Sequence, residues 1–138
     1  MIALAAAGGD HSVFLKDIAA SEDISEKYLS LIVIPLRAAG LIRSIRGARG
    51  GYILDREPKD ITLRDIVEAV EGETCLVNCV KHPDSCPRVP VCPTRDTWTH
   101  LSNTIKEAMA AVTLAQLVAG REDKKTTAKP RSRQIKTG

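Results

Sequence analysis

The stretch from Cys75 to Trp98 constrains the fold most, because it divides the chain and follows no regular pattern. It reads CLVNCVKHPDSCPRVPVCPTRDTW and holds all four cysteines, separated by three, six and five residues. Four prolines and the lack of apolar periodicity predict a loop rather than a helix or a strand. A loop of this length inside a chain of 138 residues is unusual unless it binds something. We therefore expect a binding segment between two structured parts.

The four cysteines favour a metal site over structural disulfides, because no other feature of the sequence is typical of a secreted protein. Thiolates are soft ligands that suit iron–sulfur clusters, zinc and copper(I). A zinc ribbon has two pairs of closely spaced cysteines, and the cysteines of this chain are not spaced in that way. This spacing disfavours zinc without excluding it. Free thiols, or a redox-active disulfide, are the alternative that spacing alone leaves open.

The composition is that of one compact domain with appendages. Apolar residues make up 43% of the chain but aromatic residues only 3%, so aliphatic side chains are expected to build the core. There is no membrane-spanning run, and the opening MIALAAAGG lacks the basic flank of a signal peptide, which predicts a cytoplasmic protein. From Arg121 onward seven basic residues accompany two acidic ones, which predicts a disordered basic tail. The tail either attracts phosphate or only aids solubility.

Before the cysteines, the pattern predicts two helices joined by a tight turn. Residues 14–20 form a short amphipathic helix. The next helix runs from Glu26 to about Ala39, with Ser25 as its N-cap. Pro35 lies inside this helix and predicts a bend or a tightened last turn. The buried stripe is expected to comprise Leu29, Ile32, Val33 and Leu36.

A β-hairpin is predicted directly after these helices. Residues 41–46 alternate like a strand, residues 47–51 are a glycine-rich turn, and residues 52–54 are the return strand. A helix-turn-helix followed by a hairpin is a winged helix, whose second helix enters the major groove of DNA. Arg46 and Arg49 lie at the wing, where a guanidinium can clamp a phosphate or reach into the minor groove. A solvated basic hairpin tip is the alternative.

Two further helices flank the cysteine stretch. Thr62 is a good N-cap for a helix over residues 63–70, which Gly72 ends. After the cysteines, residues 94–117 predict one long helix, which exceeds what a small domain needs. Part of it is expected to pair with a second copy of the chain, although a helix folded wholly on its own core is the alternative. Its apolar stripe comprises Trp98, Leu101, Ile105, Ala108, Met109, Val112 and Ala115.

Several of these runs closely resemble the IscR-type regulators of the Rrf-two family of bacterial transcription factors, which also includes CymR-type regulators. The runs are LKDIA, ISEKYLSLIVIPLRAAGLIRSIRGARGGY, ITLRDIVEAVEG and VTLAQLV, and the DNA-binding half is the most CymR-like. The resemblance extends to about residue 118. It implies a mostly α protein with a small β-wing, a winged helix-turn-helix domain and a long C-terminal dimerisation helix. It also implies a homodimer that binds a double-stranded DNA operator.

By position in this resemblance, Cys79, Cys86 and Cys92 match the cysteines that hold an iron–sulfur cluster in cluster-bearing members. A [2Fe-2S] centre is favoured over a [4Fe-4S] centre. Where such members have a histidine as fourth ligand, this chain has Arg95, which stays protonated and cannot be an ordinary ligand. The fourth ligand is therefore left open. The candidates are Cys75, His82, Asp96, His100 or a residue of the partner subunit.

The resemblance also assigns DNA contacts. Lys27, Tyr28 and Ser30 occupy the exposed positions of the recognition helix, and Arg46 matches a wing arginine. Related members have a glutamate where Ser30 stands, so their base preference does not transfer. Met1 aligns inside the first helix of the family, so a basic phosphate-contacting segment is apparently missing and DNA affinity is expected to be reduced.

The function predicted from the sequence is a DNA-binding transcriptional regulator, a repressor in the first instance, whose operator affinity depends on an iron–sulfur cluster or on thiol state. The alternative is a CymR-like regulator controlled by a partner protein, with structural or zinc-binding cysteines. No arrangement typical of an enzyme is present. The expected organisation is a winged helix-turn-helix over residues 1–55, a linker and core helix over 56–72, a cluster-binding loop over 73–97, a dimerisation helix over 98–118 and a basic tail over 119–138.

Overall fold

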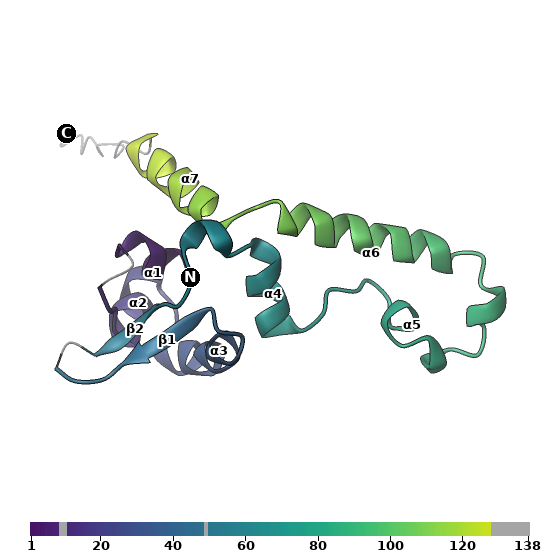
Figure 1. Ribbon diagram of the computed structural model, residues 1–138, viewed down its shortest axis with the longest axis horizontal. Coiled ribbons are helices and arrows are strands. Elements are labelled where there is room, and N and C mark those ends of the chain that lie inside the picture. Colours follow the sequence, from purple (N-terminus) through teal and green to yellow (C-terminus); the bar gives the residue numbers. More distant parts are fainter. Residues whose placement is uncertain (9–10, 49, 128–138) are drawn as a thin grey trace, which may run out of the picture.

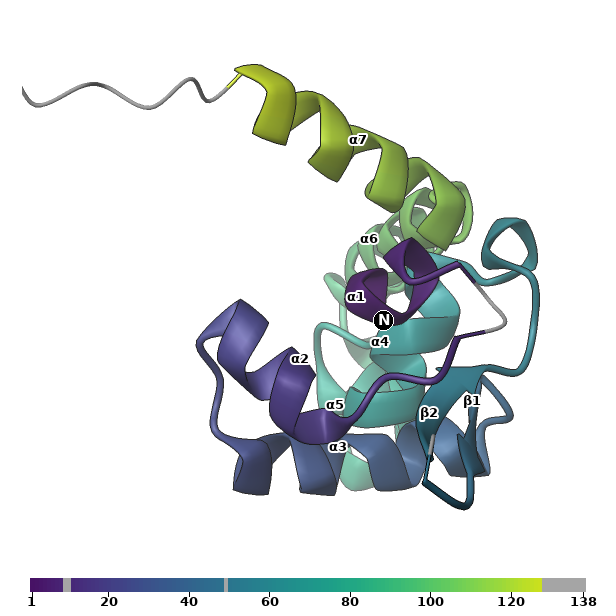
Figure 2. The same ribbon diagram turned by 90° about the vertical axis from the view of Figure 1, so that its left-hand side faces the viewer.

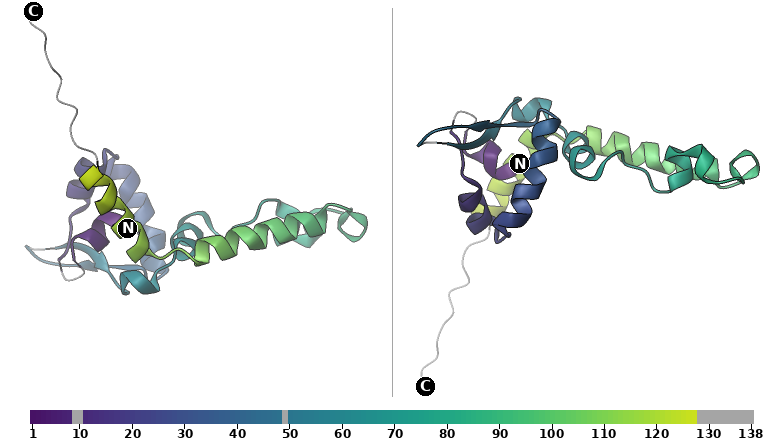
Figure 3. Two further views of the ribbon diagram at one scale, coloured as in Figure 1. Left: turned by 90° about the horizontal axis from the view of Figure 1, so that it is seen from above. Right: turned by 90° about the horizontal axis from the view of Figure 1, so that it is seen from below.

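The computed structural model describes residues 1–8, 11–48 and 50–127, with side chains placed up to Glu122. It consists of a head and an arm (Figure 1). The head comprises residues 1–61 and 114–127 of the described ranges, beginning with α1 (Ile2–Ala6). The arm comprises residues 73–110. Figure 3 shows the arm projecting from one side of the head in both of its views.

The helix-turn-helix lies where the sequence predicts it. Helix α2 (Leu15–Glu22) ends at Asp23, whose φ of 53° reverses the chain direction. Helix α3 (Glu26–Ala38) begins at the predicted N-cap, because Ser25 Oγ accepts a hydrogen bond from the Tyr28 N–H at 3.4 Å. The two helices pack against each other.

Helix α3 continues through Pro35 and ends in a Schellman turn at Gly40. The Gly40 N–H donates to the Arg37 carbonyl at 3.0 Å, and the Leu41 N–H donates to the Leu36 carbonyl at 3.0 Å. Gly40 has a φ of 67°, which favours glycine. The last turn is tightened, as predicted, but by the left-handed conformation of Gly40 rather than by Pro35, which lies within the continuous helix.

The wing is a two-stranded antiparallel sheet of β1 (Ile42–Ile45) and β2 (Gly51–Leu54). A third segment joins it, since Val13 and Tyr52 exchange backbone hydrogen bonds at 3.0 and 2.9 Å. This close approach explains Gly51, because a Cβ there would lie 2.6 Å from the Val13 carbonyl oxygen. The glycine-rich turn predicted from the sequence therefore also permits the wing to pack on the segment before α2.

Helix α4 (Leu63–Glu71) follows the 3-10 turn η1 (Pro58–Asp60) and ends at Gly72, as predicted. It packs against α3 on one side and against the arm helix α6 (Arg95–Ala110) on another. It is thus the element that joins the head to the arm.

The cysteine segment, residues 73–94, runs outward along α6, and α6 returns toward the head (Figure 1). The prediction of a plain loop here is wrong in part, because the segment contains three short helical turns. Two of them carry a proline at one of their first two positions, where its fixed φ fits and no N–H donor is needed. The turns are α5 (Asn78–Lys81), η2 (Pro83–Ser85) and η3 (Val89–Val91).

The single long helix predicted over residues 94–117 is also wrong, because the structure divides it into α6 and α7 (Leu114–Thr127). The break forms a short antiparallel bridge with the start of α4. The Leu63 N–H donates to the Val112 carbonyl at 2.8 Å, and the Leu114 N–H donates to the Ile61 carbonyl at 2.8 Å. Backbone groups used in this bridge cannot continue the helical hydrogen bonds.

Helix α7 starts at a capping pair and covers α1 and η1. The Gln116 side-chain oxygen accepts from the Thr113 N–H at 2.8 Å, and Thr113 Oγ accepts from the Gln116 N–H at 3.3 Å. The prediction of a disordered basic tail over residues 119–138 is wrong for residues 119–127, because α7 is helical to Thr127. Residues 128–138 of that tail lie outside the described residues. Figure 2 shows α7 on the side of the head opposite α3.

The core lies in the head and is aliphatic, as the composition predicts. Val33 and Leu36 of the predicted stripe are buried, whereas Leu29 and Ile32 are half-buried. In the part of the chain that the structure describes, no helix has the length and apolarity needed to cross a membrane. The buried apolar residues are Leu4, Val33, Leu36, Leu41, Ile42, Ile53, Leu54, Ile61 and Leu114.

Candidate DNA-binding surface and cysteine segment

The outer face of α3 carries the predicted recognition residues. Lys27, Tyr28 and Ser30 are all exposed. The Ser30 hydroxyl donates to the Glu26 carbonyl at 2.9 Å, which leaves its oxygen only as an acceptor toward solvent. Lys27 is therefore the cationic donor of this trio.

The wing brings a second cation to the same side of the head. Arg46 follows β1 directly and is exposed. Figures 1 and 2 both place α3 and the wing on the lower side of the head, away from α7. Arg49, the other predicted wing residue, lies outside the described residues. Helix α3 and the wing are thus arranged to approach one partner surface together.

All four cysteines are half-buried and free in the structure. Cys79 lies in α5, and Cys86 and Cys92 follow η2 and η3. The Cys75 thiol donates to the Val77 carbonyl at 2.9 Å. The short helical turns therefore distribute the predicted ligands along the segment.

The Cys92 thiol has an environment that favours its thiolate. A hydrogen bond from the Thr94 hydroxyl, whose oxygen lies 3.5 Å from the Cys92 sulfur, lowers the pKa of this thiol. The backbone N–H groups of Thr94 and Arg95, at the start of α6, lower the pKa further. A thiolate is the form of cysteine that binds a metal.

The predicted ligands fit a soft metal centre by chemistry, but the structure does not bring them together. Among the described residues, no group of three His, Cys, Asp or Glu side chains is placed to hold a metal ion. His82, Asp96 and His100 are exposed, so each is open to solvent. Binding at Cys79, Cys86 and Cys92 therefore requires the segment to rearrange.

Arg95, the third residue after Cys92, is half-buried. Its Nε is buried and has no hydrogen-bond partner in the described part of the chain. A buried unpaired donor is costly, so this position favours an acceptor or an anion nearby. Thiolates and sulfides satisfy that requirement by charge.

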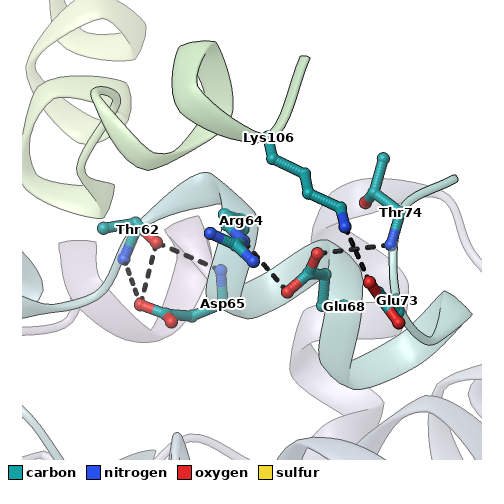
Figure 4. Close-up of polar contacts among 7 residues, drawn as sticks. All are labelled: Thr62, Arg64, Asp65, Glu68, Glu73, Thr74 and Lys106. Atoms are coloured by element: carbon teal, nitrogen blue, oxygen red, sulfur yellow. Dashed lines mark hydrogen bonds and ion pairs between the residues drawn. The ribbon is translucent and has the colours of Figure 1, made fainter. Parts of the chain in front are cut away.

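A group of polar contacts fixes the start of the cysteine segment to both neighbouring helices (Figure 4). The Thr74 N–H donates to Glu68 of α4 at 3.2 Å, and Lys106 of α6 donates to Glu73 at 2.7 Å. The Leu76 N–H donates to the hydroxyl of Ser102, which is fully buried. Lys106 lowers the pKa of the Glu73 carboxyl through this hydrogen bond and its charge. The segment therefore cannot shift at its start without disturbing α4 or α6.

The other end of α4 is fixed by a capping box, also shown in Figure 4. The Thr62 N–H donates to Asp65 at 2.9 Å, and the Asp65 N–H donates to the Thr62 hydroxyl at 3.1 Å. Burial alone would raise the pKa of Asp65, but the Thr62 donors and the nearby Arg56 and Arg64 lower it. Both ends of α4 are thus held by side-chain contacts.

Sequence reasoning missed these contacts and two apolar residues of α3. The contacts join residues far apart in the sequence, such as Glu73 and Lys106, and no local signal marks them. Leu31 and Ile34 are exposed on the outer face of α3. Helical periodicity places both residues opposite the predicted buried stripe, so their exposure could have been predicted from the sequence.

The helix-turn-helix, the wing and the exposed cations on both define a winged-helix DNA-binding protein. Residues 1–120 match the model of the Rrf2 family, described as an iron-dependent transcriptional regulator. The chain belongs to the Rrf2 family of transcriptional regulators.

Individual relatives agree with this assignment. The chain is 38% identical over 119 residues to the HTH-type transcriptional regulator CymR of Bacillus subtilis (strain 168), covering 86% of this chain and 81% of that protein. It is 33% identical over 132 residues to the HTH-type transcriptional regulator NsrR of Geobacillus kaustophilus (strain HTA426), covering 95% and 90%. The solved structure of T. potens IscR matches with a TM-score of 0.71 and 33% identity, covering 99% and 84%. The predicted family and fold class are confirmed, and the relatives are named regulators rather than enzymes, as expected.

Proposed function

We propose that the chain is a homodimeric, operator-binding transcriptional repressor. Its DNA affinity depends on the state of the cysteine segment. One observation carries this proposal: α4 contacts the recognition helix α3, while its Glu68 holds the backbone of Thr74 at the start of the segment. A change in the segment therefore has a direct route to the DNA-binding surface. Binding chromosomal DNA places the protein in the cytoplasm.

The DNA contacts are assigned from exposure and charge. Lys27, Tyr28 and Ser30 on α3 face the major groove, where lysine can bind the acceptors of guanine. Arg46 and Arg49 contact phosphate or enter the minor groove from the wing. Lys27 and Arg46 are exposed, and the elements that carry them, α3 and the wing, lie on the same side of the head, which supports this assignment.

The dimer seam is assigned to α6. Trp98, Leu101 and Ile105 are 39%, 41% and 36% exposed, and with Met109 they follow one face of the helix. Ser102 and Lys106, which hold the cysteine segment, lie on the adjacent face. The segment thus borders the proposed seam. Its rearrangement can therefore alter the relative positions of the two DNA-binding domains of the dimer.

Cys79, Cys86 and Cys92 would hold an iron–sulfur cluster, for which [2Fe-2S] is proposed over [4Fe-4S]. The thiolate-favouring surroundings of Cys92 and the unpaired Arg95 Nε support this assignment. The fourth ligand is proposed from the partner subunit or from Cys75, His82, Asp96 and His100. When bound, such a cluster cross-links the segment and makes its conformation sensitive to oxidants and to cluster supply.

The chain itself supplies the coupling. Closing the segment around three cysteines would pull on residues 73–76, whose backbone and side chains contact Glu68, Ser102 and Lys106. Each state of the segment then favours one arrangement of α4 and α6. Couplings of this kind typically change affinity about 5- to 150-fold.

A second function class is a CymR-like regulator controlled by a partner protein, with structural or zinc-binding cysteines. The similarity to CymR favours it, and so does the separation of the cysteines in the structure. Zinc bound by the cysteines belongs to this class. Here the DNA contacts stay as proposed, and only the signal differs.

The experiment that separates these functions is an absorption spectrum of the full chain, purified and reconstituted without oxygen. The proposal expects visible charge-transfer bands that serine at Cys79, Cys86 or Cys92 each abolishes. Cys75→Ser then tests the fourth ligand, because bleaching identifies Cys75 and retained colour points to the other candidates. Stoichiometric zinc without iron and sulfide would contradict the cluster and favour the second class.

A further inference from the structure

Two large aliphatic side chains lie on the outer face of the recognition helix. Leu31 and Ile34 are each 61% exposed. With Lys27 and Ala38 they form a row at spacings of four, three and four residues, which one side of a helix presents. The row lies opposite the buried stripe, so the core of the head does not use it.

The same face offers few hydrogen-bonding groups. Lys27 begins the row, and the Ser30 hydroxyl beside it already donates to the Glu26 carbonyl. Leu31 and Ile34 have no polar atoms. Tyr28, which is 55% exposed beside the row, adds a hydroxyl. This helix can therefore read base edges by apolar contact through Leu31 and Ile34 as well as by hydrogen bonds.

The major groove has one apolar group at the base edges, the C5-methyl of thymine. The row is continuous with the surface that a winged helix inserts into that groove. Leu31 lies in the second turn of α3, within the N-terminal part that reaches base edges in such proteins. We infer that Leu31, with Ile34 beside it, determines operator specificity by packing on thymine methyl groups. This inference rests on the proposed function.

A protein partner is the competing occupant of this face, and charge decides against it. The row begins at a lysine, and α3 lies on the same side of the head as the wing, which carries the exposed Arg46. These two cations complement a phosphate backbone. The apolar seam proposed for a second copy lies on the arm, away from this face. The DNA major groove is therefore the occupant that both the charge and the position favour.

The test starts from a pool of random-sequence DNA duplexes, because the operator is unidentified. The full chain, prepared with and without oxygen, selects its binding sequences from this pool. Each thymine in the selected motif is then replaced by deoxyuridine, which removes only the methyl group. Losing a buried methyl is expected to weaken binding about fourfold at a contacted position. Deoxyuridine outside the motif is the control.

Variants assign the contact to residues. In Leu31→Ala or Ile34→Ala, the loss caused by deoxyuridine at the contacted position should fall below about twofold, since the partner of the methyl is gone. Leu31→Met should keep the methyl sensitivity. Both side chains are mostly exposed, so these changes leave the core intact.

The outcomes separate the two proposals. A selected motif whose binding is unchanged by deoxyuridine at every thymine overturns this inference and leaves the DNA-binding function in place. Loss of self-association or of a protein complex in the Leu31→Ala, Ile34→Ala double variant, with methyl sensitivity unchanged, overturns it in favour of a protein contact. Failure to select any sequence from the pool, in either preparation, contradicts the proposed function itself and this inference with it.

Discussion

In the head, nine aliphatic side chains are buried, whereas in the described arm residues 73–110 the one buried side chain is that of Ser102. The arm instead exposes Leu76, Val91, Trp98, Leu101 and Ile105. Burial of apolar area is the main force that stabilises a fold. The head therefore has the core of an independent domain, while the apolar face of the arm stays exposed in the single chain.

The difference bears on how such a protein can respond to a signal. Segments with few buried contacts rearrange at low free-energy cost, whereas packed cores do not. The cysteine segment belongs to the first kind, and the helix-turn-helix belongs to the second. The proposed signal at the cysteines would therefore move the arm without unfolding the DNA-binding surface.

The largest expected effect is on self-association. Ile105→Glu combined with Met109→Glu would bury unpaired charges at the proposed seam and should weaken the dimer by about 3–5 kcal/mol. Sedimentation measures the change. Asn103→Glu combined with Ala110→Glu adds the same charge at exposed positions of α6 away from the seam and should leave the dimer intact. A dimer that survives the first pair places the seam elsewhere.

The next effect concerns the core. Ile61 is fully buried, so Ile61→Ala should lower the free energy of unfolding by about 2–5 kcal/mol. The matched change Ile105→Ala, at a concentration where sedimentation shows monomer, should cost less than about 1 kcal/mol, because that side chain is exposed in the single chain. Urea denaturation followed by circular dichroism measures both. Equal losses would abolish the distinction between head and arm.

The wing gives a smaller effect. Arg46→Ala should weaken operator binding by about 1–3 kcal/mol if the guanidinium reads a base edge, and by less, equally for all sequences, if it contacts phosphate. Titration of DNA at several salt concentrations distinguishes these cases. Lys59→Ala removes one exposed positive charge in η1, which packs on α7 on the opposite side of the head, and should change little. Unchanged affinity in Arg46→Ala would show that this wing residue does not contact the operator.

The smallest effect is on the cap of α4. The folded-state pKa of Asp65 is lowered, so its stabilisation is present above the unfolded pKa of about 3.9 and is lost as the pH falls through the folded value. Asp65→Ala should therefore cost about 0.5–2 kcal/mol at pH 7, and the difference from the unchanged chain should shrink in strong acid. Urea titrations across this pH range measure it. A difference that does not depend on pH would show that the carboxylate charge is not what stabilises the cap.

The elements that the sequence predicted correctly are those with local signals. Ser25 caps α3 and Gly40 ends it, each through contacts set by one or two residues. The glycine-rich turn of the wing was also predictable, but the close approach of Gly51 to Val13 was not, because these residues are distant in the chain. The division between α6 and α7 was not predictable in this way. It depends on backbone pairing of residues 112–114 with residues 61–63, which are distant in the chain.

In the candidate site, too, features with local sequence signals were predictable and features that depend on distant contacts were not. Exposure of Lys27 and Arg46 follows from helical and strand periodicity, so these positions were predictable. The separation of the cysteines was not, because the short turns at residues 78–91 follow from proline geometry and from contacts with α6. The contacts of Glu68, Glu73 and Lys106 that link the segment to the head also required the structure.

The most direct test of the account is the operator affinity of one preparation in two states of its cysteines. Affinity is measured for protein reconstituted without oxygen and for the same protein after removal of the bound centre. If the cysteine segment controls DNA binding, the operator affinity of the unchanged chain should differ at least about fivefold between the two states. In the variant that carries serine at Cys79, Cys86 and Cys92, the operator affinity should be the same after both treatments. Equal affinity of the unchanged chain in both states would contradict control of DNA binding by the cysteine segment.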